Sequence, residues 1–328
     1  MTVSPAASAL AFQSQTAAPR RSPTDALTLL HRRLALRNQE RLRPTLDPPA
    51  GDPSSELADR RDEERFVARA RREVAPLLAD VPDDPARFLD WFTALRETGP
   101  GQGDPLFPWL AEEASLDELR WFLGQEVAGE AGFEDLLALT QLKMPARPKL
   151  EMARNYWDEM GRGHASGMHG PMLDKLATGL AVHLPLEQIV WPALALANLM
   201  VALAWNRHYA YQAVGALGVI ELTAPGRAAQ VNAGLRRLGV DPGLRQYFAL
   251  HATLDVQHSA TWNAEVVGPL VAADPRCARA IAEGALLRLA AGARCFEAYR
   301  RHLYGGSHPQ ATRRASSVAM NRSPMSRR

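Results

Sequence analysis

Cysteine is nearly absent from this chain of 328 residues, which contains only Cys277 and Cys295. So few cysteines exclude a disulfide-stapled fold, and no Cys-x-x-Cys motif is present to bind zinc or carry thiol redox chemistry. Both residues lie in a helical pattern, so we expect packed free thiols. A long apolar run is also missing. The most apolar stretch, LALANLMVALAW (194–205), is much shorter than the ~20 residues that a membrane-spanning helix needs.

A strong charge of either sign is missing too. The 38 basic and 36 acidic residues give a net charge of +2, which provides no general attraction to nucleic acid or to an anionic membrane. The first residues, MTVSPAASAL, lack the basic segment that opens a secretory signal. We therefore expect a cytoplasmic protein whose partner is a small-molecule substrate, not nucleic acid or a membrane.

Signals for β-strands are absent as well, because no segment alternates clearly and no Asn-Gly hairpin turn occurs. The apolar residues instead recur at helical spacing, which predicts an all-α bundle of about seven core helices with an N-terminal helical extension. Helices are expected over 24–45, 57–79 and 84–97, from Ser115 toward Leu142, from near Lys149, Pro185 and Pro225, after 241–243, and over 274–304. The predicted division is a disordered segment (1–22), the extension (23–105), the main domain (106–304) and a disordered tail (305–328).

One short segment concentrates ionisable side chains. In HATLDVQH, His251, Asp255 and His258 stand at i, i+4 and i+7, which places them within ~40° of one another on a helix. Phe248 shares this face, so the face is expected to point inward. Three buried ionisable groups need compensation, and a metal ion supplies it, since imidazole and carboxylate ligands together suit iron, manganese or zinc. The alternatives are that these side chains are partly exposed polar groups, or that Asp255 simply pairs with one protonated histidine.

Further ligands must come from other helices. Glu126 lies on a largely apolar helix face, Glu159 follows two aromatic residues, and His169 comes ten residues after Glu159, nearly three helical turns later. Glycines between Glu159 and His169 could kink the helix and bring the two to one face. The nearby rivals are Glu130, Glu151, Asp158 and His164. A ferritin-like site fits poorly, because only one inward carboxylate-x-x-His pair is evident.

Taken together, these residues make the sequence resemble the heme-oxygenase-like diiron oxidases and oxygenases over roughly residues 106–304. His-x3-Asp-x2-His at 251–258, the Glu159-x9-His169 pair and the upstream Glu126 carry the resemblance, supported by YQAVGALGVIELTAP and YFALHATLDVQHSATW. The resemblance implies a heme-oxygenase-like bundle that holds two iron ions and uses O2 through a peroxo-diferric intermediate. The implied ligands, which are also the implied catalytic residues, are Glu126, Glu159, His169, His251, Asp255 and His258. Heme chemistry itself would leave the cluster at 251–258 without a role.

The resemblance implies an oxidoreductase of secondary metabolism that acts on an amino acid, an amine or a fatty acid. It leaves room for an external electron donor and a homodimer. N-oxygenation of an amine is the first alternative. Some N-oxygenating members carry a carboxylate three residues before the second-helix histidine, where this chain has Ser166. The second alternative is a non-catalytic helical protein that binds a metal or a partner.

For the substrate, the sequence offers charged and aromatic residues near the predicted ligand helices. Arg154 and Arg207 are candidates for binding a substrate carboxylate, because guanidinium binds carboxylates in a bidentate way. Tyr211 is a candidate for lining the pocket. Glu221, an acidic residue in an apolar run, is expected to point inward and to pair with one of these arginines.

Overall fold

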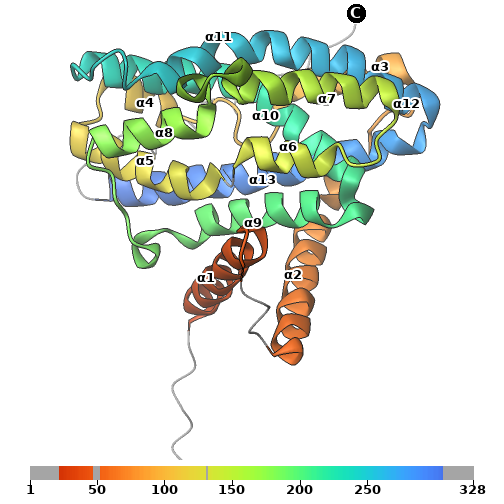
Figure 1. The fold of residues 1–328 in the computed structure, drawn as a ribbon, viewed down its shortest axis with the longest axis horizontal. Coiled ribbons are helices and arrows are strands. Elements are labelled where there is room, and N and C mark those ends of the chain that lie inside the picture. Colours follow the sequence, from red (N-terminus) through yellow and green to blue (C-terminus); the bar gives the residue numbers. More distant parts are fainter. Residues whose placement is uncertain (1–21, 47–51, 131, 306–328) are drawn as a thin grey trace, which may run out of the picture.

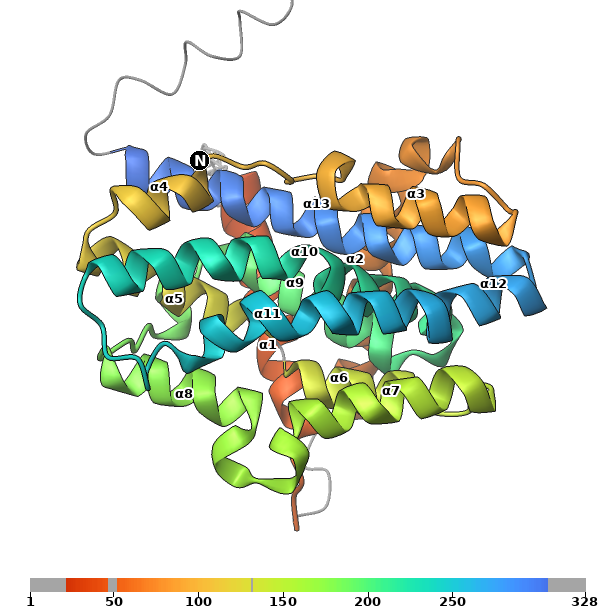
Figure 2. The same cartoon turned by 90° about the horizontal axis from the view of Figure 1, so that it is seen from above.

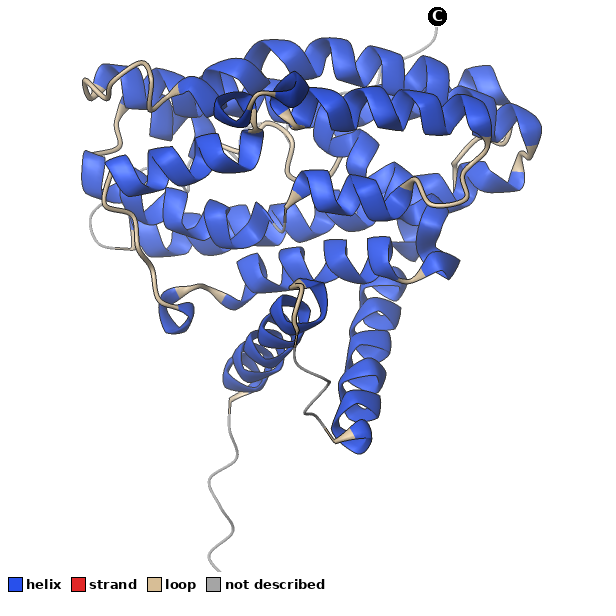
Figure 3. Ribbon diagram, in the orientation of Figure 1, coloured by secondary structure: helices blue, strands red, loops and turns tan. Residues whose placement is uncertain are grey.

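The computed structural model describes residues 22–46, 52–130 and 132–305, and these residues are almost entirely helical, with no strand among them (Figure 3). The predicted all-α architecture is confirmed. The helices follow in the order α1 (Pro23–Leu42), α2 (Pro53–Val74), α3 (Pro85–Thr98), α4 (Leu106–Glu112), α5 (Leu116–Glu130), α6 (Phe133–Thr140), α7 (Ala146–Glu159), α8 (His169–Gly179), α9 (Trp191–Trp205), α10 (Ala210–Arg237), α11 (Gln246–Thr261), α12 (Gly268–Ala273) and α13 (Arg276–Tyr304).

The long helix α10 lies at the centre of the bundle and packs against α13 and α11 along much of its length, with α4 and α9 also in contact (Figure 2). Helix α9 is apolar on every side and almost wholly buried, as expected for a helix surrounded by others. Leu119, Phe122, Leu199, Val214 and Ile281 all belong to one continuous core. The bundle therefore holds its elements rigidly enough to position a polar site within it.

Glycines set the close approach of α10 and α13. A Cβ added to Gly215 would lie 1.8 Å from the carbonyl oxygen of Ile281, and one added to Gly284 would lie 1.8 Å from that of Gln212. Only glycine lets these two backbones touch without displacing one helix.

The substitution Gly215→Ala is therefore expected to lower the free energy of unfolding by about 3 kcal/mol, since the new methyl group must push two packed helices apart. Gly226→Ala on the same helix is the control, because nothing lies within 4 Å of its added Cβ. That change should be neutral or stabilise by up to ~1 kcal/mol. Thermal unfolding of both variants tests the crossing, and equal melting temperatures would contradict it.

The N-terminal helices differ in how they join the bundle. Helices α1 and α2 project from the side of α9 (Figure 1), where α1 contacts α9 and α2 contacts α13. The end of α2 adds Val67, Ala70 and Val74 to the main core, and α3 buries Phe88 and Phe92 there. The disorder predicted for residues 1–22 and 305–328 falls outside the described residues except at Ser22 and Gly305, which flank α1 and α13.

Several predicted helix boundaries were wrong. Pro225 lies inside α10 and does not begin a helix, because a long helix packed on three sides tolerates the one backbone hydrogen bond that proline removes. The helix expected to run to Leu142 ends at Glu130, and α6 begins after Gly132, whose φ of +71° is incompatible with a continuous helix. Helix α9 starts at Trp191, later than Pro185. Within the described ranges, no helix is both long and apolar enough to cross a membrane.

Candidate metal centre

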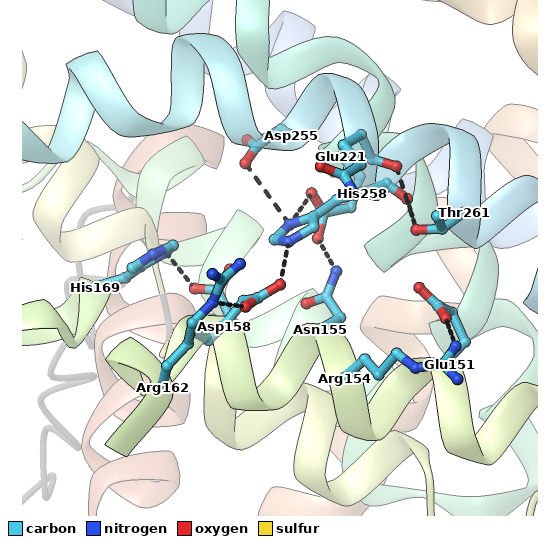
Figure 4. A network of polar contacts seen from close by, with 12 residues as sticks. Glu151, Arg154, Asn155, Asp158, Arg162, His169, Glu221, Asp255, His258 and Thr261 are labelled. Atoms are coloured by element: carbon cyan, nitrogen blue, oxygen red, sulfur yellow. Dashed lines mark hydrogen bonds and ion pairs between the residues drawn. The ribbon is translucent and has the colours of Figure 1, made fainter. Parts of the chain in front are cut away.

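Four helices bring ionisable side chains to one place in the bundle. Helix α7 ends at Glu159, α8 begins at His169, α10 carries Glu221, and α11 carries the predicted stripe (Figure 4). Asp255 and His258 are buried, and His251 is partly buried. The prediction that the stripe points inward agrees with this placement.

A tight reversal of the chain joins Glu159 to His169. The chain turns through 160–168, where Met160 and Met168 form an isolated β-bridge. Gly161 has a φ of +61°, and a Cβ there would lie 2.3 Å from the carbonyl carbon of Gly167, so a glycine is required. The sequence predicted that these two residues approach along a kinked helix. They do approach, but through a turn between two helices.

The first cluster of potential ligands comprises Glu159, His169 and His251, whose ligand atoms all lie within 4.8 Å of one another. The His169 Nδ1 atom lies 2.6 Å from Glu159 Oε2, yet the two atoms are not aligned as a hydrogen bond. The imidazole rings of His169 and His251 are 4.6 Å apart. The His251 Nδ1–H donates to the carbonyl oxygen of Tyr247 at 2.7 Å, which leaves its Nε2 lone pair free to bind a metal.

The second cluster comprises Glu159, Glu221 and His258, again within 4.8 Å of one another. His258 Nδ1 lies 3.5 Å from Glu221 and 4.0 Å from Asp255, while Nε2 lies 3.2 Å from Asp158. Glu221 accepts a hydrogen bond from Asn155 at 2.7 Å. The expected pairing of Glu221 with an arginine is therefore wrong, because the side chains that reach it are an amide and an imidazole.

Burial makes this concentration of charge costly. Burial and the neighbouring Glu221 raise the pKa of Glu159 to about 9, and burial with the same neighbour raises that of Asp255 to about 10. Burial lowers the pKa of both His169 and His251 to about 4, so both imidazoles are neutral near pH 7. Burial opposes protonation of His258, but Glu221 and Asp158 outweigh it and raise its pKa to about 9.

Unpaired polar atoms inside the clusters indicate that these residues could hold a metal ion. His169 Nδ1, His258 Nδ1 and Asp255 Oδ1 are buried without a hydrogen-bond partner, although buried polar atoms are normally satisfied. Neutral imidazoles with carboxylates form a donor set that iron prefers. A divalent cation would both satisfy these atoms and offset the mutual repulsion of the carboxylates.

The metal-free protein is accordingly expected to lose stability as the pH rises from about 6.5 to 8. In this window the raised pKa values keep Glu159, Asp255 and His258 protonated in the folded state, whereas the unfolded chain has released those protons, so each rise in pH favours unfolding. The melting temperature should fall by several degrees, and saturating Mn²⁺ or anaerobic Fe²⁺ should abolish the slope. A flat profile without metal would contradict this electrostatic description.

The upstream glutamates occupy two levels of α5, one turn apart. Glu126 interacts with Arg288, Arg227 and Tyr299, and it belongs to neither ligand cluster. Glu130 lies nearer the clusters: burial and the charge of Glu159 raise its pKa to about 8. The prediction that Glu126 is a ligand stays untested. Of the two glutamates, Glu130 lies closer to Glu159 and the ligand clusters.

The three residues predicted to bind substrate have other contacts. Arg154 is exposed and pairs with Glu151. Arg207 donates to the carbonyl oxygens of Leu139, Thr140 and Leu142, which it holds at the end of α6. Tyr211 is exposed and interacts with Cys277. None of the three lines the cavities described next. Ser166 is also exposed, in the turn before α8.

Two cavities meet at the ligand clusters. The inner one, of about 110 Å³, is lined by Glu126, Glu130, Glu159, Arg227 and Arg288 among others. The outer one, of about 610 Å³, shares Glu130, Glu159 and His251 with it and extends past His169 toward His183. Sequence reasoning missed Arg227 and Arg288. The available signal was a lone arginine within an apolar helical run, as in GALLRLAAG (284–292).

Comparison with known proteins identifies a family that covers this part of the chain. A family model described as "Iron-containing redox enzyme" matches residues 120–293, a range that includes both ligand clusters and both arginines of the inner cavity. A search of curated proteins gives no significant match.

Proposed function

The chain belongs to the family of iron-containing redox enzymes, and from that premise we propose that it is an O2-dependent, non-heme diiron oxidase or oxygenase of a small metabolite. The proposed substrate is an amino acid, an amine or a fatty acid. An external electron donor is part of the proposal wherever the reaction consumes more electrons than the substrate supplies.

A single observation carries the proposal of two ions: Glu159 belongs to both ligand clusters. One cluster adds His169 and His251, the other Glu221 and His258. A carboxylate has two oxygens and can bridge two cations, so a shared carboxylate between two imidazole-bearing groups supports a pair of metal ions. Asp255 and Glu130, both close to the clusters, complete the proposed ligand set with carboxylates from α11 and α5.

A bound pair of ferrous ions would supply the electrons with which O2 is reduced. The residues of the chain prepare the ligands for that role. The Tyr247 carbonyl fixes the proton of His251 on Nδ1. Asp158, itself held by Arg162 at 2.6 Å, faces Nε2 of His258 and leaves Nδ1 toward the cluster. Such partners of metal-bound imidazoles orient the ring and raise its basicity.

The two cavities give the proposed centre the space that catalysis requires. A catalytic metal site keeps a position open for substrate or O2, whereas a structural site is closed by protein ligands. Glu130, Glu159 and His251 line both cavities, so small molecules have room on either side of these residues.

The activity is tested by supplying the purified protein with Fe²⁺, reductant and O2 in the presence of a panel of amino acids, amines and fatty acids. Substrate-dependent O2 uptake, with a product whose mass differs from that of the substrate, is the expected result. His251→Ala is the matched control, because it removes one ligand and should reduce turnover at least ~100-fold. Oxygen uptake that is unchanged in this variant would mean that adventitious iron is responsible.

A further inference from the structure

Two guanidinium groups face the inner cavity from different helices. Arg227 lies on α10 and Arg288 on α13, and both line the cavity together with Glu126. Arg227 lies over the rings of Phe107 and Phe296, with its central carbon 5.9 and 5.7 Å from their centroids. The two arginines thus bring positive charge to a chamber whose wall combines apolar side chains with the carboxyl groups of the ligand clusters.

These cations have few partners. Among the described residues, the polar contact of Arg227 is a hydrogen bond donated to Thr223 at 3.0 Å, and neither arginine forms an ion pair. The Nε atom of Arg288 is buried and has no hydrogen-bond partner. A guanidinium offers five N–H donors, and leaving buried donors and charge unmatched is unfavourable.

Glu126 is the nearest candidate for a counter-ion within the protein, and it does not neutralise the pair. It is one carboxyl against two cations, and it also interacts with Tyr299. Burial raises its pKa, and burial with the charge of Arg288 lowers that of Arg227 to about 10. Burial is the largest cause of both pKa shifts; the like charge of Arg288 adds to it for Arg227, whereas the two arginines oppose the rise at Glu126.

The position of the pair relative to the ligand clusters is set by α10. Glu221 and Arg227 are six residues apart, which is about 9 Å along a helix. The cavity wall also includes apolar side chains, among them Ile220, Phe248 and Val231. A molecule with an anionic end at the arginines would therefore extend an apolar portion toward the proposed iron site.

We propose that Arg227 and Arg288 form a subsite for the carboxylate of the substrate, which holds an apolar carbon chain between the arginines and the metal ligands. The substrate part of this inference rests on the proposed function. Guanidinium recognises carboxylates in a bidentate geometry, and the cavity wall suits a short hydrocarbon portion. Amines without an acid group are disfavoured as substrates.

The binding test uses the metal-free full-length protein, so its outcome does not depend on iron. Hexanoate is expected to raise the melting temperature and to bind measurably by calorimetry, whereas 1-hexanol at the same concentration should not. Affinity should also rise from butyrate to hexanoate, by about fourfold for each methylene that becomes buried. Equal effects of hexanoate and 1-hexanol would overturn the proposal.

Variants locate the site. Arg227→Met and Arg288→Met are each expected to weaken hexanoate binding at least tenfold, while Arg288→Lys should fall between Met and the native residue. Arg236→Met is the control, since Arg236 is an exposed arginine on the same helix. Folded Met variants with unchanged affinity would overturn the proposal. If these variants do not fold, the Lys variant decides, and undiminished affinity there counts against the subsite.

The two proposals fail separately. Hexanoate binding that requires both arginines, in a protein that takes up no iron, would leave the subsite standing and remove the proposed function. A protein that binds iron and consumes O2 but does not distinguish hexanoate from 1-hexanol would leave the function standing and remove the subsite.

Discussion

Replacing Glu159 by alanine is expected to abolish the binding of both iron ions. Glu159 lies in both ligand clusters, so its loss removes the carboxylate that the two proposed ion positions share. The affinity for Fe²⁺ should fall by at least ~100-fold, because even the outer partners of metal ligands are worth 10- to 100-fold. Anaerobic equilibrium binding, followed by desalting and metal analysis, measures this loss.

Glu151→Ala is the matched control for this variant. Glu151 is also buried on α7, but it pairs with Arg154 instead of facing the cluster. The control should bind iron as the native protein does. If both variants lose iron equally, the effect belongs to helix α7 as a whole, and the assignment of Glu159 as the shared ligand fails.

The second prediction with a large expected effect is that Glu130, and not Glu126, is needed for iron binding. Glu130→Gln should lose at least one iron ion per chain and most of the activity, since its carboxyl group lies near Glu159. Glu126→Gln should retain both ions, because Glu126 faces Arg288, Arg227 and Tyr299. The amide keeps the size of the side chain, so packing changes little in either variant.

Metal content and O2 uptake of the two variants decide between the glutamates. The reverse pattern, with iron lost from Glu126→Gln and retained in Glu130→Gln, would show that the ligand is the one expected from the sequence. Loss from both would indicate that the end of α5 has been disturbed, which circular dichroism would reveal as reduced helicity.

Helical periodicity predicted the part of the centre that lies on one element. His251, Asp255 and His258 share a face because residues at i, i+4 and i+7 must do so on any helix. The prediction needed no knowledge of the other helices. The all-α fold followed in the same way from spacing and from the lack of strand signals.

The choice among nearby carboxylates was beyond the sequence because it depends on packing. Glu126 and Glu130 are one turn apart on the same face, so periodicity treats them alike, and only the rotation of α5 against its neighbours α9, α8 and α10 separates their surroundings. The turn at 160–168 posed a related problem, since its glycines permit both a kinked helix and a reversal. Arg227 and Arg288 lie on different helices that the sequence cannot place side by side.

The central claim is that buried imidazoles and carboxylates from several helices hold a pair of iron ions. The most direct test is to titrate the native metal-free protein with Fe²⁺ under anaerobic conditions, count the bound iron after desalting, and then admit O2. If the proposal is right, we expect two iron ions per chain and an optical band that forms on exposure to O2. A protein that binds no iron under these conditions would contradict the claim.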